Sequence, residues 1–121
     1  MLLIVVLIAA SQSTLISLSA IISSPPSYRN LIALRYGELH RHNLIRSLHQ
    51  APRLRLSSSL CHQAQIQAET MLKTGRVSYS KDAMLGRIGE NIYGAFSPGT
   101  LRYKPHTASK YWYRNNKNYD Y

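Results

Sequence analysis

The opening of the chain restricts what the remainder can fold into, because no charged side chain precedes Arg29. Residues 2–10, LLIVVLIAA, form an uninterrupted apolar run, and small polar residues then interrupt further apolar positions as far as Ile22. This pattern is typical of a secretory signal peptide whose hydrophobic region is residues 2–10. An uncleaved signal anchor is the alternative, since the uncharged stretch approaches the roughly 20 residues that cross a bilayer as a helix. Removal of this segment would leave about 100 residues, which suffice for one small domain.

The sequence therefore predicts three regions. Residues 1–23 are the signal peptide or anchor, residues 24–29 are a linker, and residues 30–121 are the folded domain. The linker begins within SSPPS, residues 23–27, because consecutive prolines cannot enter the interior of a helix. Cys61 is the only cysteine, so no disulfide can form within the chain.

The folded part is strongly basic. Fifteen lysines and arginines against five acidic residues give the chain a formal net charge of +10. Such a charge attracts nucleic acids, anionic glycans and acidic lipids. No nucleic-acid-binding motif organises the arginines and the nine tyrosines, and a secretory start separates the chain from cellular nucleic acids. A specific nucleic-acid partner is not expected, whereas a basic protein that binds polyanions or membrane surfaces remains an alternative function.

The first stretch with helical periodicity covers residues 30–49, which contain no proline. Positions three or four residues apart define one face of this predicted helix. They are Leu31, Leu34, Glu38, His42, Ile45 and His49. Gly37 weakens the helix, because glycine in a helix interior has a high entropic cost. The following residues 50–56, QAPRLRL, are predicted to turn into an extended connector in which Leu54 and Leu56 point the same way.

A second helix is predicted between two recognisable end signals. Serines at positions 57–59 are typical of an N-cap, and Gly75 is typical of the position just after a helix. One face of this helix collects small and apolar side chains. They are Leu60, Ala64, Ala68, Met71 and Leu72.

The last third of the chain predicts less regular structure. Residues 76–85 are expected to be irregular, and residues 89–96, GENIYGAF, to form a short strand or a turn leading to one. Residues 97–105 are a predicted loop. A short final helix is expected from about Thr107, with Trp112 buried.

No pattern of catalytic or metal-binding residues is present. His42 and His49 can share one side of the first helix, but zinc usually takes three or four ligands, and no H-E-x-x-H or C-x-x-C pattern occurs. Cys61 and His62 are adjacent in a predicted helix, so they point to different faces and do not form a dyad. The sequence therefore predicts no catalytic residue, no metal site, no cofactor and no enzymatic activity.

Four blocks together resemble the CAP superfamily, which includes cysteine-rich secretory proteins, antigen 5 venom allergens and pathogenesis-related 1 proteins. The blocks are HNLIRSLHQAPRL (42–54), AQIQAETM (64–71), GENIY (89–93) and YWYRNNKNYDY (111–121). They occur in the family's order and at similar spacings over residues 31–121. The resemblance implies an α+β fold, a three-layer α-β-α sandwich in a mostly secreted protein that is not an enzyme. Its implied partner is a lipid, a sterol or an extracellular protein, and a membrane only if the N-terminal segment stays uncleaved. The oligomeric state is left open.

The resemblance also implies a cleft with two histidines and two glutamates that can hold a divalent metal. Glu90, in the G-E-N block, corresponds to one of these glutamates and is the candidate binding residue. Tyr79 stands where the first histidine is usual, and Asn115 where the second glutamate is usual. Because one of four ligands remains, the metal site is expected to be lost, and Glu90 is expected to satisfy backbone donors instead.

The chain ends before the family's later G-H-x-T block and the strands that supply most of its sheet. The resemblance therefore implies an incomplete CAP domain, mostly helical with a short residual sheet. An exposed strand edge near residues 89–96 is expected to pair with another chain. The role that follows is binding or interaction through a degenerate cleft, or that of a non-functional fragment.

Overall fold

The structure of this chain is a computed structural model that describes residues 2–10, 15–22, 28–96 and 104–114, with side chains described in 31–95 and 104–114. Its strands are β1 (Leu2–Ala10), β2 (Leu15–Ile22), β3 (Arg55–Leu56) and β4 (Ile88–Phe96). Its helices are α1 (Tyr28–Leu48), α2 (Ser58–Thr74), α3 (Lys81–Met84) and α4 (Thr107–Tyr113).

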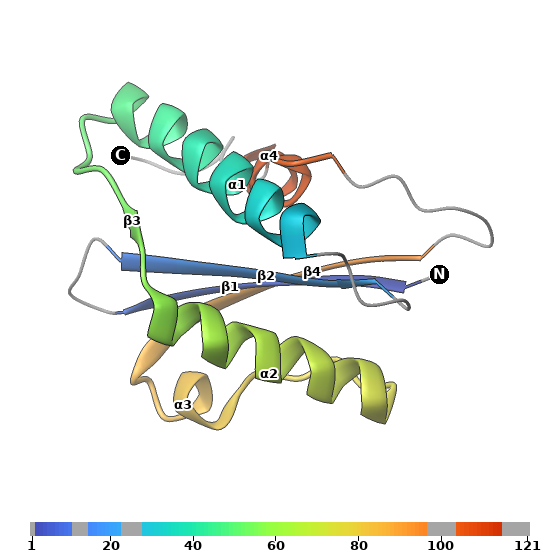
Figure 1. The fold of residues 1–121 in the computed structure, drawn as a ribbon. Coiled ribbons are helices and arrows are strands. Elements are labelled where there is room, and N and C mark those ends of the chain that lie inside the picture. The colour runs from blue at the N-terminus through green and yellow to red at the C-terminus, as the bar shows by residue number, and fades with distance from the viewer. Residues whose placement is uncertain (1, 11–14, 23–27, 97–103, 115–121) are drawn as a thin grey trace.

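These elements form three layers (Figure 1). Helices α1 and α4 cover one face of the sheet, and helices α2 and α3 lie on the opposite face. Helices contribute more residues than strands. The predicted fold class, a mostly helical α+β chain with an α-β-α arrangement, is confirmed.

The sheet has four strands in the order β3-β2-β1-β4. Strand β1 is antiparallel to both of its neighbours, and the short β3 runs parallel to β2. Both β1 and β2 come from the segment that the sequence predicts to be a signal peptide or anchor, so the sheet is larger than a short residual one. That prediction concerns processing during export, and strand pairing does not test it. No helix in the described part of the chain is long and apolar enough to span a membrane.

Helix α2 begins and ends as predicted. The Ser57 hydroxyl accepts a hydrogen bond from the Leu60 N–H at 3.3 Å, and Gly75 adopts a left-handed conformation with φ of 65°. The predicted apolar face forms the core, against which Leu72, Ile88 and Ile92 pack. Its buried members are Leu60, Ala64, Ala68 and Met71.

Helix α1 begins earlier than predicted. It includes Tyr28 and Arg29, which were assigned to the linker, while residues 23–27 lie outside the described residues. Gly37 has a packing role, because a Cβ at this position would overlap the Cβ of Pro105, just before α4. The glycine that weakens α1 thus permits the close approach of a distant segment.

Two sequence-based expectations were wrong in detail. The stretch predicted to be irregular contains α3, because the Ser80 hydroxyl caps the Ala83 N–H at 3.2 Å. Trp112, predicted to be buried, is only half-buried. The buried residues of the short α4 are instead Ala108 and Ser109, which are 0% and 2% exposed.

Candidate functional site

The family's cleft position, Glu90, lies on β4 and already has a hydrogen-bond partner. Both of its carboxylate oxygens accept the Ser80 N–H at 3.3 Å, which connects β4 to the start of α3. Tyr79 is 56% exposed, and Asn115 lies outside the described residues. Within the described ranges, no three histidine, cysteine or acidic side chains cluster closely enough to hold a metal ion. The geometry gives Glu90 a backbone donor directly after Tyr79, and no metal-binding cluster forms around it among the described residues.

A buried glutamate connects the two helices on the other face. Glu38 is 0% exposed, and its two carboxylate oxygens accept the N–H groups of Ala108 and Ser109, each at 3.1 Å. These donors belong to the first turn of α4, where backbone N–H groups lack partners within the helix. Glu38 therefore fixes α4 against α1. Sequence reasoning missed this role, although a carboxylate within the stripe between Leu34 and His42 was a signal for it.

His42 lies one turn further along α1 and packs against α4. Its Nδ1 donates a hydrogen bond to the backbone oxygen of Glu38 at 2.9 Å, and its ring centroid is 6.2 Å from that of Trp112. Burial lowers the pKa of His42. The hydrogen bond to the Glu38 backbone and the negative charge of the Glu38 side chain partly oppose this shift, and the positive charge of Arg46 lowers the pKa further. The ring is thus held in its neutral form.

His49 makes the corresponding contact at the far end of α4. Its Nε2 lies 2.9 Å from the Tyr113 hydroxyl, and the ring centroids are 5.8 Å apart. Both histidines therefore face α4, which confirms that His42 and His49 share one side of the first helix. Their partners on α4 are the aromatic side chains of Trp112 and Tyr113.

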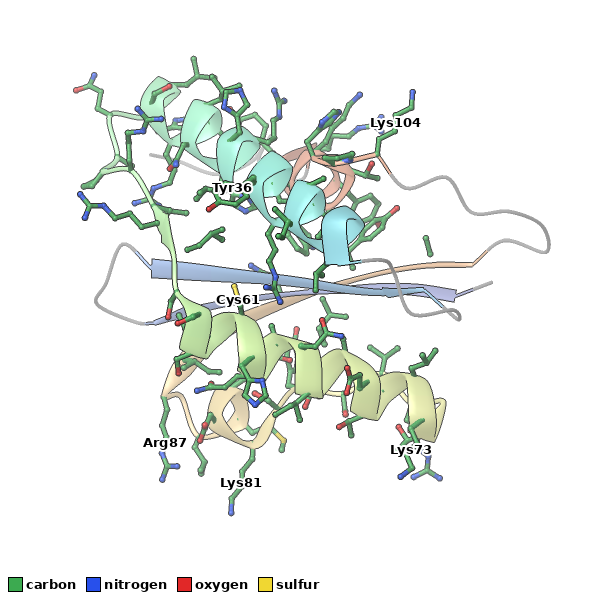
Figure 2. All side chains as sticks on the ribbon, in the orientation of Figure 1. Tyr36, Cys61, Lys73, Lys81, Arg87 and Lys104 are labelled. Carbon is green, nitrogen blue, oxygen red and sulfur yellow. The ribbon has the colours of Figure 1, made fainter. Side chains whose placement is uncertain are left out.

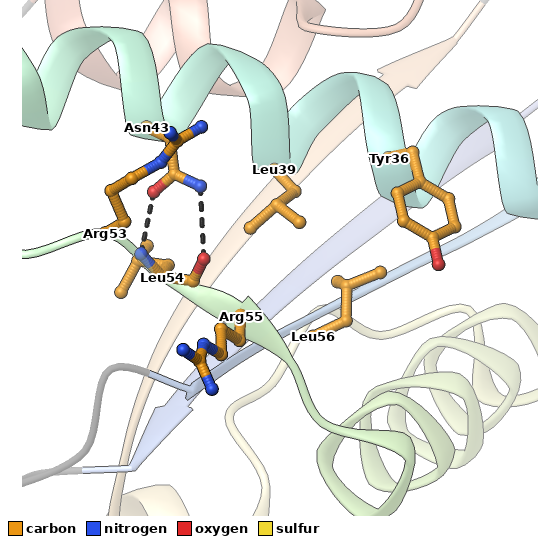
Figure 3. A pocket seen from close by; sticks show the side chains of 7 residues that line it. All are labelled: Tyr36, Leu39, Asn43, Arg53, Leu54, Arg55 and Leu56. Atoms are coloured by element: carbon orange, nitrogen blue, oxygen red, sulfur yellow. Dashed lines mark hydrogen bonds between the residues drawn. The ribbon is translucent and has the colours of Figure 1, made fainter.

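Asn43 holds the segment after α1 in an extended conformation (Figure 3). Its side-chain Nδ2 donates to the Leu54 backbone oxygen at 3.1 Å, and the Leu54 N–H donates to Asn43 Oδ1 at 2.7 Å. Asn43 is 8% exposed. Its side-chain amide donates one hydrogen bond to the Leu54 backbone and accepts one from it, as the backbone of a neighbouring strand would do. This pair of hydrogen bonds fixes the distance between α1 and β3.

A groove of about 720 Å³ opens beside this pair of hydrogen bonds. Its lining comes from α1, from the segment that leads into β3 and from β3 itself (Figure 3). The lining residues are Tyr36, Leu39, Asn43, Arg53, Leu54, Arg55 and Leu56. The prediction that Leu54 and Leu56 point the same way is confirmed, since both are half-buried in this lining. The alternating PRLRL pattern was the signal for an apolar interior with a cationic rim.

The two arginines of the groove are exposed. Neither Arg53 nor Arg55 forms an ion pair with any residue that the structure describes. The described carboxylates all have other partners. Glu38 accepts from α4, Glu69 from Gln65, Asp82 from Arg87 and Glu90 from Ser80. The groove therefore combines three leucines with two uncompensated positive charges.

Comparison with known proteins gives one family. The family model of the cysteine-rich secretory proteins, CAP, matches residues 39–121, more than half of the chain. The chain belongs to this family, whose members are typically secreted and generally not enzymes. No curated protein and no solved structure matches the chain. The family match includes Glu90, most of the groove lining and α4.

Proposed function

We propose that this CAP-family chain is a secreted, non-enzymatic binding protein whose groove between α1 and β3 takes a single-chain anionic amphiphile. The observation that carries this proposal is the lining, in which Leu39, Leu54 and Leu56 lie beside the exposed guanidinium groups of Arg53 and Arg55. Volumes of about 300 to 1,000 Å³ are usual for small-molecule sites, and apolar walls with a few polar groups are their usual composition. Lipid-like ligands are also what the CAP resemblance implies.

The leucines of the lining would bind the acyl chain of the ligand, and the arginines would bind its anionic headgroup. An acyl chain would cover the leucines, and each buried methylene contributes about 0.8 kcal/mol, so two more carbons should tighten binding about tenfold. A carboxylate or phosphate headgroup would accept hydrogen bonds from Arg53 and Arg55, because guanidinium groups bind such anions in a bidentate manner. The amide of Asn43 already donates one hydrogen bond to Leu54 and accepts one from it, so its role here is to hold the groove wall.

The alternative, a protein that binds polyanions or membrane surfaces through charge alone, needs its cations on one face. Figure 2 shows Lys104 on the α1 and α4 side of the sheet and Lys73, Lys81 and Arg87 on the opposite side. A flat membrane or a linear polyanion would contact only one of these sets at a time. Further cations of α1 and α4, among them Arg35, Arg41, Arg46 and Lys110, belong to the groove's side of the sheet, so titrations are needed to separate the two functions.

Calorimetric titration of the full chain with dodecyl phosphate tests the proposal. Replacing Arg53 and Arg55 by glutamine should weaken binding by at least tenfold, since hydrogen bonds to charged groups contribute roughly 1.5 to 3 kcal/mol each. The matched control replaces Lys73 and Arg76 by glutamine, which changes the net charge equally at exposed positions outside the groove. Equal weakening in both variants would contradict the groove.

Three further ligands separate the possible sources of affinity. Inorganic phosphate should bind far more weakly than dodecyl phosphate, because it lacks the acyl chain, and dodecyl maltoside should do so because it lacks the anion. Heparin that competes with dodecyl phosphate at physiological salt would favour the polyanion alternative.

Secretion is a separate part of the proposal. It rests on the uncharged start of the chain and on the fact that members of the CAP family are typically secreted. An epitope-tagged full chain should be recovered from the culture medium of a eukaryotic expression host. Recovery only in the cytosolic fraction would contradict it.

A further inference from the structure

The N-terminal strand pair, β1 and β2, occupies the centre of the sheet, although its sequence resembles a removable leader. Every residue of β1 pairs with β4, from Leu2 opposite Phe96 to Ala10 opposite Ile88. On its other edge β1 pairs with β2, from Leu3 opposite Ile22 to Ala9 opposite Ile16. Without β1, the strand β4 has no neighbouring strand in the described part of the chain.

The same strand pair covers the apolar face of α2. Helix α2 contacts both β1 and β2, and its buried residues include Ala64, Ala68 and Met71 at 0% to 1% exposed. Strand β4 adds Ile88 and Ile92 to this cluster, but β4 is held in place through its pairing with β1. Removal of the strand pair would leave most of this face in water, a loss that a small domain tolerates poorly.

The wall of the ligand groove also depends on the strand pair. Strand β3 has β2 as its neighbour in the sheet, with Arg55 opposite Leu15 and Leu56 opposite Ile16. Both Arg55 and Leu56 line the groove. The N-terminal strand pair therefore contributes to the core and to the position of the groove wall at once.

We propose that residues 2–10 and 15–22 donate the central strands of this domain, so that the domain folds only while this segment stays bound to it. A strand-accepting edge gains main-chain hydrogen bonds from an added strand and specificity from its side-chain pockets. Such a strand must be apolar and uncharged, and the segment that resembles a leader meets this requirement. Loss of the segment leaves the edge of β4 open to pairing with another chain.

A cleavable full chain tests this inference without reference to ligand binding. A site-specific protease sequence is placed at residues 23–27, and the folded chain is cut. The freed segment should elute with the rest of the chain in gel filtration, and the cut complex should keep one cooperative thermal transition. After separation in denaturant, the larger fragment should fail to regain that transition unless the segment is returned.

Two results would overturn the inference. The first is release of the segment on cutting while the larger fragment keeps its melting temperature. The second is a full chain with no cooperative transition at all. If the segment proves essential but dodecyl phosphate does not bind, the proposed ligand is wrong and the strand inference stands.

Disulfide trapping checks the register in the intact chain. With Cys61 replaced by alanine, cysteines at Val6 and Ile92, which lie opposite each other, should form an intramolecular disulfide under mild oxidation. The control pairs Val6→Cys with Tyr93→Cys, one position out of register, where the side chains alternate to the other face of the sheet. Trapping at 6 and 92 should be at least about tenfold faster than in the control, and equal rates would contradict the register.

Discussion

The two faces of the sheet are held by different chemistry. On the α2 face, an apolar cluster excludes water, and its buried members are Leu60, Ala64, Ala68 and Met71. On the α1 and α4 side, the contacts among described side chains include polar and aromatic ones: Glu38 with the first turn of α4, His42 with Trp112, and Asn43 with Leu54. On the α2 face, stability depends on the volume of the buried apolar side chains. On the α1 and α4 face, it depends on the geometry of hydrogen bonds and on the protonation of His42.

This difference also separates the two candidate sites. Glu90 belongs to the face with the apolar cluster, and its carboxylate is engaged by the Ser80 N–H. The groove belongs to the other face, where Asn43 fixes one wall and Arg53 and Arg55 remain exposed. A binding site needs walls held by neighbouring contacts and free groups at its rim. This comparison supports the proposal that a ligand binds on the α1 face, although the family resemblance pointed to Glu90.

The largest expected effect is the loss of volume on the α2 face. Met71→Ala should lower the free energy of unfolding by about 3 kcal/mol, because the side chain is 1% exposed and its removal leaves a cavity. The matched control is Met84→Ala, whose side chain is 72% exposed and should change stability by less than about 0.5 kcal/mol. Urea denaturation measures both, and similar losses would argue against a core on this face.

A somewhat smaller effect is expected from the polar contact between α1 and α4. Glu38→Gln should destabilise by about 2 kcal/mol, because an amide accepts through one oxygen and leaves one of the N–H groups of Ala108 and Ser109 without its acceptor. Glu69→Gln is the matched control, since this exposed carboxylate bonds only Gln65 among the described contacts. Equal unfolding free energies for the two variants would contradict a stabilising contact between Glu38 and α4.

The smallest effect is a pH dependence of the free energy of unfolding that comes from His42, between α1 and α4. Because burial lowers the pKa of His42 in the folded chain, the unfolded chain takes up this proton first as the pH falls below 6.5. His42 therefore leaves stability unchanged above pH 6.5 and reduces it as the pH falls toward the lowered folded pKa. One proton limits the slope to about 1.4 kcal/mol per pH unit.

The pH effect is measured as the difference between variants. Unfolding free energies of His42→Gln should change less between pH 7.5 and pH 5.5 than those of the wild type. His62→Gln, at an exposed position, should retain the wild-type slope. A wild-type slope in the His42 variant would contradict the neutral, buried ring.

The sequence predicted those parts of the fold that depend on local signals. The helical periodicity predicted α1, and the Ser57 cap and Gly75 predicted both ends of α2. Residues 89–96 were predicted to form a short strand or a turn leading to one, and they belong to β4, which begins one residue earlier at Ile88. Each of these features is set by residues within a few positions of one another, which a single sequence displays.

Long-range features could not be predicted in the same way. An uncharged apolar segment has the same composition as a leader and as a buried strand pair, so residues 2–22 gave no sign of pairing with β4. The role of Glu38 depends on N–H groups 70 and 71 residues away. The groove depends on the distance between Asn43 and Leu54, which only the folded chain defines.

The most direct test of the central claim maps the ligand on the protein. The ¹H–¹⁵N spectrum of the full chain is recorded during titration with dodecyl phosphate. The backbone signals of Tyr36, Leu39 and residues 53–56 should shift in proportion to occupancy. Shifts centred instead on Tyr79, Ser80 and Glu90 would return the binding site to the family's cleft position and contradict the assignment to the α1 face.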